Sequence, residues 1–320
     1  MFRIGILGAA DIAFNKFIPA LMKIEGVECA GVASNSPDKL KRFVEKYNVH
    51  VYSSYNEVIG DDSVDCVYIP LPPAFHYEWA KKALLAGKHV FLEKPSTTSA
   101  DDTKELVEIA GEKGLVVQEN YMFRFHAQLK EIENLIASGE LGKLRLVRTS
   151  FGFPRRAEGD FRYVKELGGG TMLDNGGYTI KLIDMLLGES MRLVSSQLDY
   201  DEKTGIDIFG TAEFVNDDGV IAQAAFGMDC QYQCSLELWG SRGRLTTGRI
   251  YTAPDGFKPV ALVETGAGSR TVELSSCDAF EESIKMYLRA VEDEKLRESM
   301  AQELVRQAEF VDDVRGMDRK

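Results

Sequence analysis

The sequence has little positive charge. Its 320 residues include 38 lysines and arginines against 50 aspartates and glutamates, which gives a formal net charge of −12. No long block of lysine and arginine occurs in it. This deficit argues against nucleic acid or an anionic membrane as the main partner. A small anionic ligand stays compatible with the composition, because it needs only a local basic site or a helix end.

Paired cysteines and long apolar segments are also missing. The five cysteines are scattered, odd in number and never spaced as C-x-x-C, which favours buried thiols over a metal site. No apolar run approaches the ~18 residues of a membrane-spanning helix, and the N-terminus enters a strand-like segment without a basic leader. We therefore expect a reduced, cytoplasmic, soluble protein without a metal centre.

The length and the pattern of apolar residues predict two domains. With 44% hydrophobic and 28% charged residues, the chain is typical of globular proteins, and 320 residues exceed one ordinary core. Over the first 120 residues, short apolar runs alternate with helical segments. The expected strands are residues 2–7, 27–34, 64–69, 90–92 and 116–118. This alternation predicts an α/β domain over residues 1–120 with a parallel, doubly wound sheet.

A turn typical of dinucleotide-binding domains follows the first expected strand. Small residues fill it: Gly8 suits a tight turn, and Ala13 allows close packing of the following helix. Ala10 replaces the usual middle glycine, so its methyl leaves less room for a pyrophosphate, yet the site stays plausible. The candidate cofactor residues of this turn are Gly8, Ala10, Asp11, Ile12 and Ala13.

The end of the second expected strand indicates which cofactor is preferred. An NAD-preferring site usually has an acidic residue here for the ribose hydroxyls. This chain has Ser34, Asn35 and Ser36 instead, with Lys39 close behind, and all can donate hydrogen bonds to a phosphate. The pattern favours NADP over NAD. The alternative is that Ser36-Pro37 is only the start of a helix.

The segment Glu93-Lys94-Pro95 closes the fourth expected strand. Open α/β sheets bind ligands at the carboxyl ends of their strands, so a lysine there is well placed for chemistry. Pro95 biases Lys94 toward extended geometry and Glu93 can hold the lysine ammonium or a ligand. The alternative is an ordinary surface ion pair at a strand end.

Beyond residue 144 the pattern changes to successive strands separated by turns. The expected strands are residues 145–153, 193–200, 207–215, 220–228, 232–239, 260–264 and 271–274. Apolar and polar residues alternate within 232–239, which predicts a large, open, mostly antiparallel sheet with one buried face. Helices are expected over residues 173–187, 278–292 and 295–314.

A glycine-rich entry at Gly168–Gly170 introduces the first of these helices. Glycines there allow another backbone or a ligand to approach closely. Asp174 and Tyr178 are four residues apart and so share one helical face, which makes them a candidate site. In the structural alternative, Asp174 balances the helix dipole and Tyr178 is a core aromatic. Arg155, Arg156 and Lys165, just upstream, could meet a diphosphate or form a solvated basic loop.

Taken together, these residues resemble the Gfo/Idh/MocA family of oxidoreductases. The resemblance spans essentially the whole chain and rests on the amino-terminal turn, Glu93-Lys94-Pro95, Glu119-Asn120, and the glycine-rich helix start with Asp174. It implies a dinucleotide-binding Rossmann domain over residues 1–120 and an α+β domain over residues 121–320. It also implies a homodimer or homotetramer, because the outer sheet face commonly pairs subunits in this family.

Two positions depart from the commonest family pattern. Tyr178 stands where many members have histidine, and Lys181 stands where an acidic residue or histidine is common. Tyrosine there resembles the branch of dihydrodiol dehydrogenases and sugar-nucleotide 3-ketoreductases of deoxysugar synthesis. Four stretches are closest to the ketoreductases: residues 10–13, 119–123, 159–163 and 226–228.

The resemblance implies hydride transfer between a nicotinamide and a sugar carbonyl, with a carbohydrate or sugar nucleotide as substrate. Lys94 and Tyr178 would act on the carbonyl oxygen, with tyrosine as proton donor and lysine as electrostatic partner, or with these roles exchanged. Alternatives are a dihydrodiol, inositol or free-sugar dehydrogenase, and a cofactor-binding regulator without turnover. The further residues implied for the cofactor or sugar are Leu71, His76, Glu93, Asn120, Arg162 and Asp174.

Overall fold

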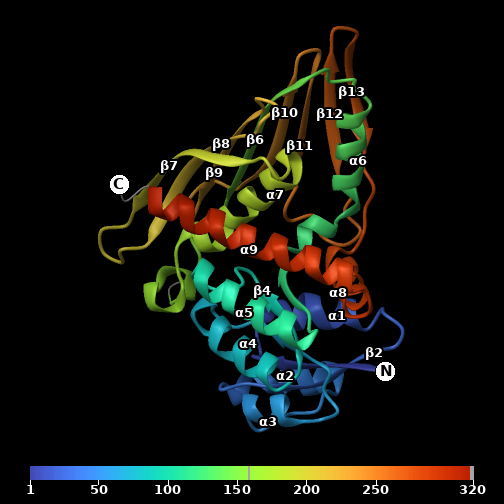
Figure 1. Ribbon diagram of the computed structural model, residues 1–320, viewed down its shortest axis with the longest axis vertical. Coiled ribbons are helices and arrows are strands. Elements are labelled where there is room, and N and C mark those ends of the chain that lie inside the picture. The colour runs from blue at the N-terminus through green and yellow to red at the C-terminus, as the bar shows by residue number, and fades with distance from the viewer. Residues whose placement is uncertain (158, 318–320) are drawn as a thin grey trace. The chain divides into compact units, whose positions relative to one another are not determined.

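The computed structural model describes residues 1–157 and 159–317. The chain separates into two compact units, which are described here one at a time (Figure 1). Among the described residues, the first contains residues 1–120 and 280–308, and the second contains residues 121–157, 159–279 and 309–317. The boundary after residue 120 was expected. The return of residues 280–308 to the first unit was not, because these residues were assigned to the second domain.

The first unit is built on a five-stranded sheet in the order β2-β1-β3-β4-β5. Every neighbouring pair of strands in it is parallel, as predicted. The chain reverses direction of winding between β1 and β3, and ligands bind beyond the carboxyl ends of strands at such a point. The strands are β1 (Phe2–Leu7), β2 (Val27–Ala33), β3 (Cys66–Ile69), β4 (His89–Glu93) and β5 (Val117–Asn120).

Helices cover both faces of this sheet. Successive strand residues point to opposite faces, and three consecutive residues of β4, Val90–Leu92, are apolar and buried, so both faces need cover. Val90 and Leu92 of β4 pack in one core with residues of α3, α4 and α5. Phe91 between them contacts the rings of Phe17 and Tyr287 on the other side. The helices of this unit are η1 (Ala13–Phe17), α1 (Ile18–Leu21), α2 (Pro37–Tyr47), α3 (Tyr55–Gly60), η2 (Pro73–Phe75), α4 (His76–Leu85) and α5 (Ala100–Lys113).

Helix α8 (Ala279–Glu292), late in the chain, packs on the parallel sheet of the first unit. Tyr287 is fully buried, its ring lies 5.0 Å from that of Phe91, and its hydroxyl lies 3.0 Å from the thiol of Cys66. Without α8, the apolar side of Phe91 and Cys66 would face water. Helix α9 (Glu294–Met317) follows and carries residues of both units.

The second unit contains an eight-stranded sheet in the order β13-β12-β11-β10-β6-β9-β8-β7. All of its strand pairs are antiparallel except β6 with β9, so the predicted large and mostly antiparallel sheet is confirmed. Strand β11 was not predicted. The strands are β6 (Leu144–Gly152), β7 (Arg192–Tyr200), β8 (Asp207–Val215), β9 (Ile221–Gly227), β10 (Gln233–Gly240), β11 (Gly243–Gly248), β12 (Val260–Thr265) and β13 (Gly268–Glu273).

One face of this sheet is buried and the other is exposed, as the alternation in β10 predicted. Cys234, Leu236 and Leu238 are at most 5% exposed, whereas Trp239 is 55% exposed. Helix α7 packs on the buried face, against β6 and β9. The remaining helices of this unit are η3 (Met122–Phe125), α6 (Ala127–Ala137), η4 (Phe161–Tyr163), η5 (Lys165–Leu167), η6 (Met172–Gly176) and α7 (Gly177–Leu187). Over the described ranges, we find no helix long and apolar enough to cross a membrane.

Candidate active site

The turn after β1 has the shape that a dinucleotide needs. Gly8 has a φ of +121°, a conformation that side chains disfavour, and a Cβ there would lie 2.8 Å from Leu71 Cδ2. Gly8 and Leu71, predicted separately, are therefore neighbours. Ala13 is fully buried and Ala10 is half-buried, which fits close packing of the following helix. Small residues at these positions are what a dinucleotide-binding turn requires.

The end of β2 presents hydrogen-bond donors rather than a carboxylate. Ser34 is half-buried, and its hydroxyl accepts a bond from the backbone N–H of Ser36 at 3.0 Å. Asn35 and Lys39 are exposed. Pro37 occupies the first turn of α2, but the Ser36 side chain makes no capping bond to the described residues of that helix. These residues fit a phosphate at this strand end.

Glu93 lies at the carboxyl edge of the sheet and is fixed by two neighbouring strands. Its Oε1 accepts hydrogen bonds from the Tyr68 hydroxyl at 2.7 Å and from Asn120 Nδ2 at 2.9 Å. Asn120 stands opposite Glu93 in the pairing of β4 with β5. Burial raises the pKa of Glu93, and the donors Asn120 and Tyr68 together with the Lys94 charge oppose that rise. The Lys94–Pro95 peptide bond is cis.

A chain of donors extends from Glu93 into α8. Gln118 Nε2 donates to the Ser283 hydroxyl at 3.0 Å, and that hydroxyl donates to Asn120 Oδ1 at 2.9 Å. Because Asn120 in turn donates to Glu93, the donors of this chain all point toward the carboxylate. Ser283 was not expected at the site, because it is separated from Asn120 by 163 residues. The alignment stabilises the ionised form of Glu93.

His76 joins two of the predicted segments. Its Nδ1 lies 2.8 Å from the carbonyl oxygen of Pro95, and its Nε2 lies 2.7 Å from that of Leu71. The ring is fully buried, and this burial lowers the pKa of His76 although both carbonyl oxygens favour the protonated ring. His76 therefore holds the Leu71 loop against the Glu93-Lys94-Pro95 segment.

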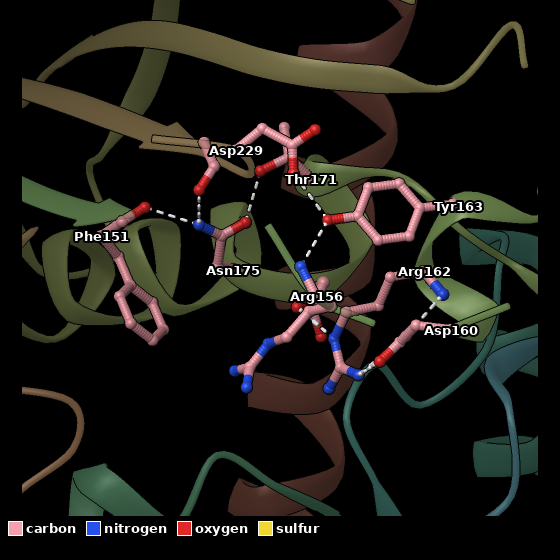
Figure 2. A network of polar contacts seen from close by, with 10 residues as sticks. Phe151, Arg156, Asp160, Arg162, Tyr163, Thr171, Asn175 and Asp229 are labelled. Carbon is pink, nitrogen blue, oxygen red and sulfur yellow. Dashed lines mark hydrogen bonds and ion pairs between the residues drawn. The ribbon is translucent and has the colours of Figure 1, made fainter. Parts of the chain in front are cut away.

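In the second unit, Arg162 and Asp174 form a half-buried ion pair. Arg162 Nε lies 2.8 Å from Asp174 Oδ2. Arg162 Nη1 lies 3.1 Å from Asp160 Oδ1 (Figure 2). Gly169 permits this approach, because a Cβ there would lie 2.6 Å from the carbonyl oxygen of Arg162. The two residues that the resemblance grouped are thus in direct contact.

The neighbouring loop is tied down by Tyr163. Its hydroxyl donates to Asp229 at 2.6 Å and accepts from the backbone N–H of Arg156 at 3.0 Å (Figure 2). Asp229 also binds the Arg155 guanidinium at 2.6 Å. Arg155 therefore neutralises a carboxylate of its own unit, whereas the Arg156 guanidinium lies over the Phe153 ring at 4.7 Å and is exposed.

Tyr178 lies in an aromatic cluster on the first turn of α7. The residue is 8% exposed, and its hydroxyl lies 3.8 Å from the Met122 sulfur. Four rings surround it at centroid distances of 4.9 to 5.8 Å: those of Tyr121, Phe123, Phe151 and Tyr251. This packing fixes the ring and leaves the hydroxyl as its one polar group. Lys181, one turn later, is also buried.

One charged residue near the predicted cofactor turn was missed. Arg42 of α2 contacts Asp11 with Nη1 at 2.6 Å and the carbonyl oxygen of Ala9 with Nη2 at 3.2 Å. In the sequence it is one of several cations on α2, and only the helix orientation shows that it faces the turn. The aromatic residues at 14, 43 and 47 were the available signal, because they can bring the two segments together.

Comparisons with known proteins agree with this arrangement. Residues 2–121 match the oxidoreductase family with an NAD-binding Rossmann fold, and residues 129–246 match the GFO/IDH/MocA C-terminal domain. Two similar relatives are dTDP-3,4-didehydro-2,6-dideoxy-alpha-D-glucose 3-reductases. The one from Actinomadura kijaniata is 36% identical and the one from Streptomyces violaceoruber is 38% identical, each over 98% of this chain and 94% of the relative.

The structural likeness covers the same length. A crystal structure of a 3-ketoreductase from Actinomadura kijaniata, in complex with NADP and TDP-benzene, has a TM-score of 0.95 and 35% sequence identity. The match covers 99% of this chain and 97% of that one. With both units matched and more than 30% identity over nearly the whole length, this chain belongs to the GFO/IDH/MocA family of oxidoreductases.

Proposed function

We propose that this protein is an NADPH-dependent reductase that reduces a keto group on a nucleotide-linked sugar. The observation that carries the proposal is the likeness to the Actinomadura kijaniata 3-ketoreductase, which spans both units at 35% identity. That enzyme was crystallised with NADP and TDP-benzene. The strand end at Ser34 supports the same cofactor, because it offers donors and no carboxylate to repel a 2′-phosphate.

Lys94 and Tyr178 are the proposed catalytic pair. The same ketoreductase has also been crystallised with one tyrosine replaced by phenylalanine, and with one lysine replaced by alanine or glutamate. Those two positions are separated in that chain by the same number of residues as Lys94 and Tyr178 in this one. Because the match covers both chains almost completely, this spacing supports the assignment.

The chemistry divides between cofactor and protein. Bound NADPH supplies the hydride. The Tyr178 hydroxyl then gives its proton to the carbonyl oxygen, which becomes the alcohol, and the Lys94 ammonium stabilises negative charge on that oxygen and on the phenolate left behind. The phenolate regains a proton from solvent. In the same proposal, the Asp174 carboxylate accepts a bond from a sugar hydroxyl, and its ion pair with Arg162 holds the carboxylate in position.

The direct test is turnover of the purified protein with NADPH. A TDP-linked 3-keto-2,6-dideoxy sugar should oxidise NADPH stoichiometrically and yield the 3-hydroxy sugar, identified by mass and NMR spectra. A trans-dihydrodiol and a free aldose, each with NADP, test the dehydrogenase alternatives. Oxidation of the dihydrodiol or of the aldose, with no reduction of the keto sugar, would replace this proposal with the corresponding dehydrogenase. NADPH binding without turnover of any of them would favour the regulator.

The hydroxyl of Tyr68 provides a prediction on pH. Because it donates to Glu93, replacing Tyr68 by phenylalanine should raise the pKa of Glu93 further above its ordinary value. Glu93 then becomes protonated at a higher pH, so the acid limb of kcat/KM for NADPH should move to higher pH. Tyr52→Phe is the matched control, because Tyr52 donates to another carboxylate, Asp61, at 2.7 Å. Equal pH profiles for Tyr68→Phe and wild type would contradict a role for the Glu93 carboxylate.

We also propose that the exposed face of the eight-stranded sheet pairs two copies of this chain. Strand register places Ile221 and Trp239 on this face, both opposite Leu146, and they are 42% and 55% exposed. Ion pairs cross the same face: Arg148 with Glu237 at 3.2 Å, and Arg244 with Glu264 at 2.6 Å. A face that carries apolar groups and both signs of charge can complement itself about a two-fold axis.

Light scattering after gel filtration tests this pairing. Wild type should elute as a dimer or tetramer, and Trp239→Arg should shift it toward monomer, because an unpaired charge would be buried in the interface. Leu85→Arg on α4 is the control, since Leu85 is also 55% exposed but belongs to the first unit. A wild-type monomer, or an unchanged mass for Trp239→Arg, would overturn the pairing. None of the five cysteines, all within the described residues, forms a disulfide bond, which fits the cytoplasmic setting that completes the proposal.

A further inference from the structure

Helix α2 packs against Phe14 of η1, the helix that follows the turn after β1. The Tyr47 hydroxyl donates to the carbonyl oxygen of Phe14 at 2.6 Å. The Phe14 ring meets the rings of Phe43 and Tyr47 edge to face, at 5.1 and 5.2 Å. Phe43 is fully buried. These contacts fix the rotation of α2 about its axis. They therefore determine that the side chain of Arg42 lies beside the turn after β1.

The Arg42 guanidinium is held by its face and by one edge. Its Cζ atom lies 4.6 Å from the centre of the Phe14 ring. Nη1 contacts Asp11, and Nη2 donates to the carbonyl oxygen of Ala9. Nε is buried and has no hydrogen-bond partner among the residues that the structure describes. A buried donor of this kind is costly unless a ligand satisfies it. The guanidinium is thus oriented in advance and has donors left to use.

Other cations near this strand end are less suited to bind a phosphate. Lys41 is paired with Asp38 at 2.9 Å, and Lys39 is exposed. An ammonium on a flexible stem acts as a point charge, whereas a planar guanidinium binds phosphate through two parallel hydrogen bonds. Lys46 also lies over the Phe14 ring, at 4.7 Å, but the guanidinium of Arg42 is the group that contacts the turn itself, at Asp11 and at the carbonyl oxygen of Ala9.

We propose that Arg42 is the residue that selects NADP, by binding its 2′-phosphate, and that Asp11 occupies the guanidinium when no cofactor is bound. The inference rests on the proposed function and adds a residue that sequence patterns did not identify. Asp11 is 80% exposed, so its ion pair with Arg42 is a surface pair of small energy that a ligand can replace. A phosphate carries more charge than a carboxylate near neutral pH and competes well for the same donors.

Fluorescence titration of NADPH and NADH against four variants tests this assignment. Arg42→Gln should weaken NADPH binding about 10- to 100-fold, the scale of one hydrogen bond between charged groups, and leave NADH binding nearly unchanged. Asp11→Asn should strengthen NADPH binding and not NADH binding, because it removes the competing carboxylate. Lys41→Gln is the matched loss of charge on α2 and should have little effect, because the Lys41 ammonium is paired with Asp38. Arg42→Lys should fall between wild type and Arg42→Gln, because it keeps the charge without the planar fork.

Three outcomes would overturn the assignment. Unchanged selectivity of Arg42→Gln would place the 2′-phosphate elsewhere, and equal loss of NADPH and NADH would show that Arg42 serves the fold or a part common to both cofactors. A large effect of Lys41→Gln would show that NADPH affinity follows the net charge of α2 and not the position of Arg42. Failure of the proposed function is distinguishable, because a wild-type protein that binds neither cofactor, or prefers NADH, fails before any variant is compared. If Arg42→Gln does not fold, Asp11→Asn and Arg42→Lys still decide.

Discussion

Replacing Tyr178 by phenylalanine should leave a folded protein that binds NADPH normally and turns over roughly 10²–10⁴-fold more slowly, the usual scale for a positioned proton donor. The fold should survive because four neighbouring rings hold the Tyr178 ring, and none of those contacts needs the hydroxyl. The loss of stability should be ~1 kcal/mol, the value of one ordinary hydrogen bond. Steady-state kinetics, NADPH titration and thermal unfolding measure the three quantities separately.

Lys94 supplies the second half of the same experiment. Lys94→Ala should lower kcat by a similar factor, because the charge on the reacting oxygen loses its cation. The double variant should be little slower than the slower single one, since residues that act as a unit are not additive. Near-normal turnover of Tyr178→Phe beside an inactive Lys94→Ala would make lysine the proton donor. Turnover that survives both changes would return Tyr178 to the core and Glu93-Lys94-Pro95 to a surface ion pair.

Tyr251→Phe is the control for this pair. Its ring belongs to the same cluster, at 5.8 Å from that of Tyr178, and it is fully buried. Its hydroxyl is bonded to Thr149 inside the second unit. The variant removes a buried hydroxyl from the same aromatic cluster and keeps the ring, so we expect a loss of stability with kcat nearly unchanged. Equal kinetic damage from Tyr251→Phe and Tyr178→Phe would indicate a packing effect.

The parallel sheet was predictable because its signals are local. Strands β1, β2 and β3 are short, mostly apolar runs followed directly by Gly8, Ser34 and Pro70. Gly8 has the positive φ that a tight turn after a strand requires. The missed strand β11 has the opposite character. Its segment Gly243–Gly248 has one buried aliphatic residue, Leu245, between polar neighbours, and the strand is defined mainly by its hydrogen bonds to β10 and β12. Such pairing forms only in the assembled sheet, so the residues of this segment alone do not predict the strand.

The same distinction explains what was missed at the site. The spacing of Asp174 and Tyr178 in the sequence was enough to group them. By contrast, the two π-helical segments, η1 after the Gly8 turn and η6 before α7, leave no sequence signature. Ser283 reaches Asn120 only because Tyr287, one turn later, fills an apolar site on the parallel sheet. Arg42 reaches Asp11 only because Phe14, Phe43 and Tyr47 fix the rotation of α2. Residues that act through tertiary packing need the fold before they can be identified.

The nucleotide part of the substrate should matter far more than its distance from the reacting carbon suggests. A TDP-linked 3-keto sugar should be reduced with a kcat/KM more than about 10³-fold above that of the same sugar without nucleotide. The diphosphate can form several hydrogen bonds to cations, each contributing about 1.5–3 kcal/mol. Binding energy from such a remote group can be expressed at the reacting carbon, so kcat should fall together with kcat/KM. Comparable values for the free sugar would favour a free-sugar dehydrogenase.

Arg156 is the side chain with which we expect to locate that effect. Its guanidinium lies over the Phe153 ring, whereas its neighbour Arg155 is already paired with Asp229. Arg156→Ala should therefore lower kcat/KM for the TDP-linked sugar about 10-fold, the scale of one charge-assisted hydrogen bond, and leave the free sugar unaffected. Arg155→Ala removes the same charge from the same loop and should change the two substrates equally. An equal loss for both substrates with Arg156→Ala would make this arginine part of the loop's structure, and the diphosphate would then have to bind other donors.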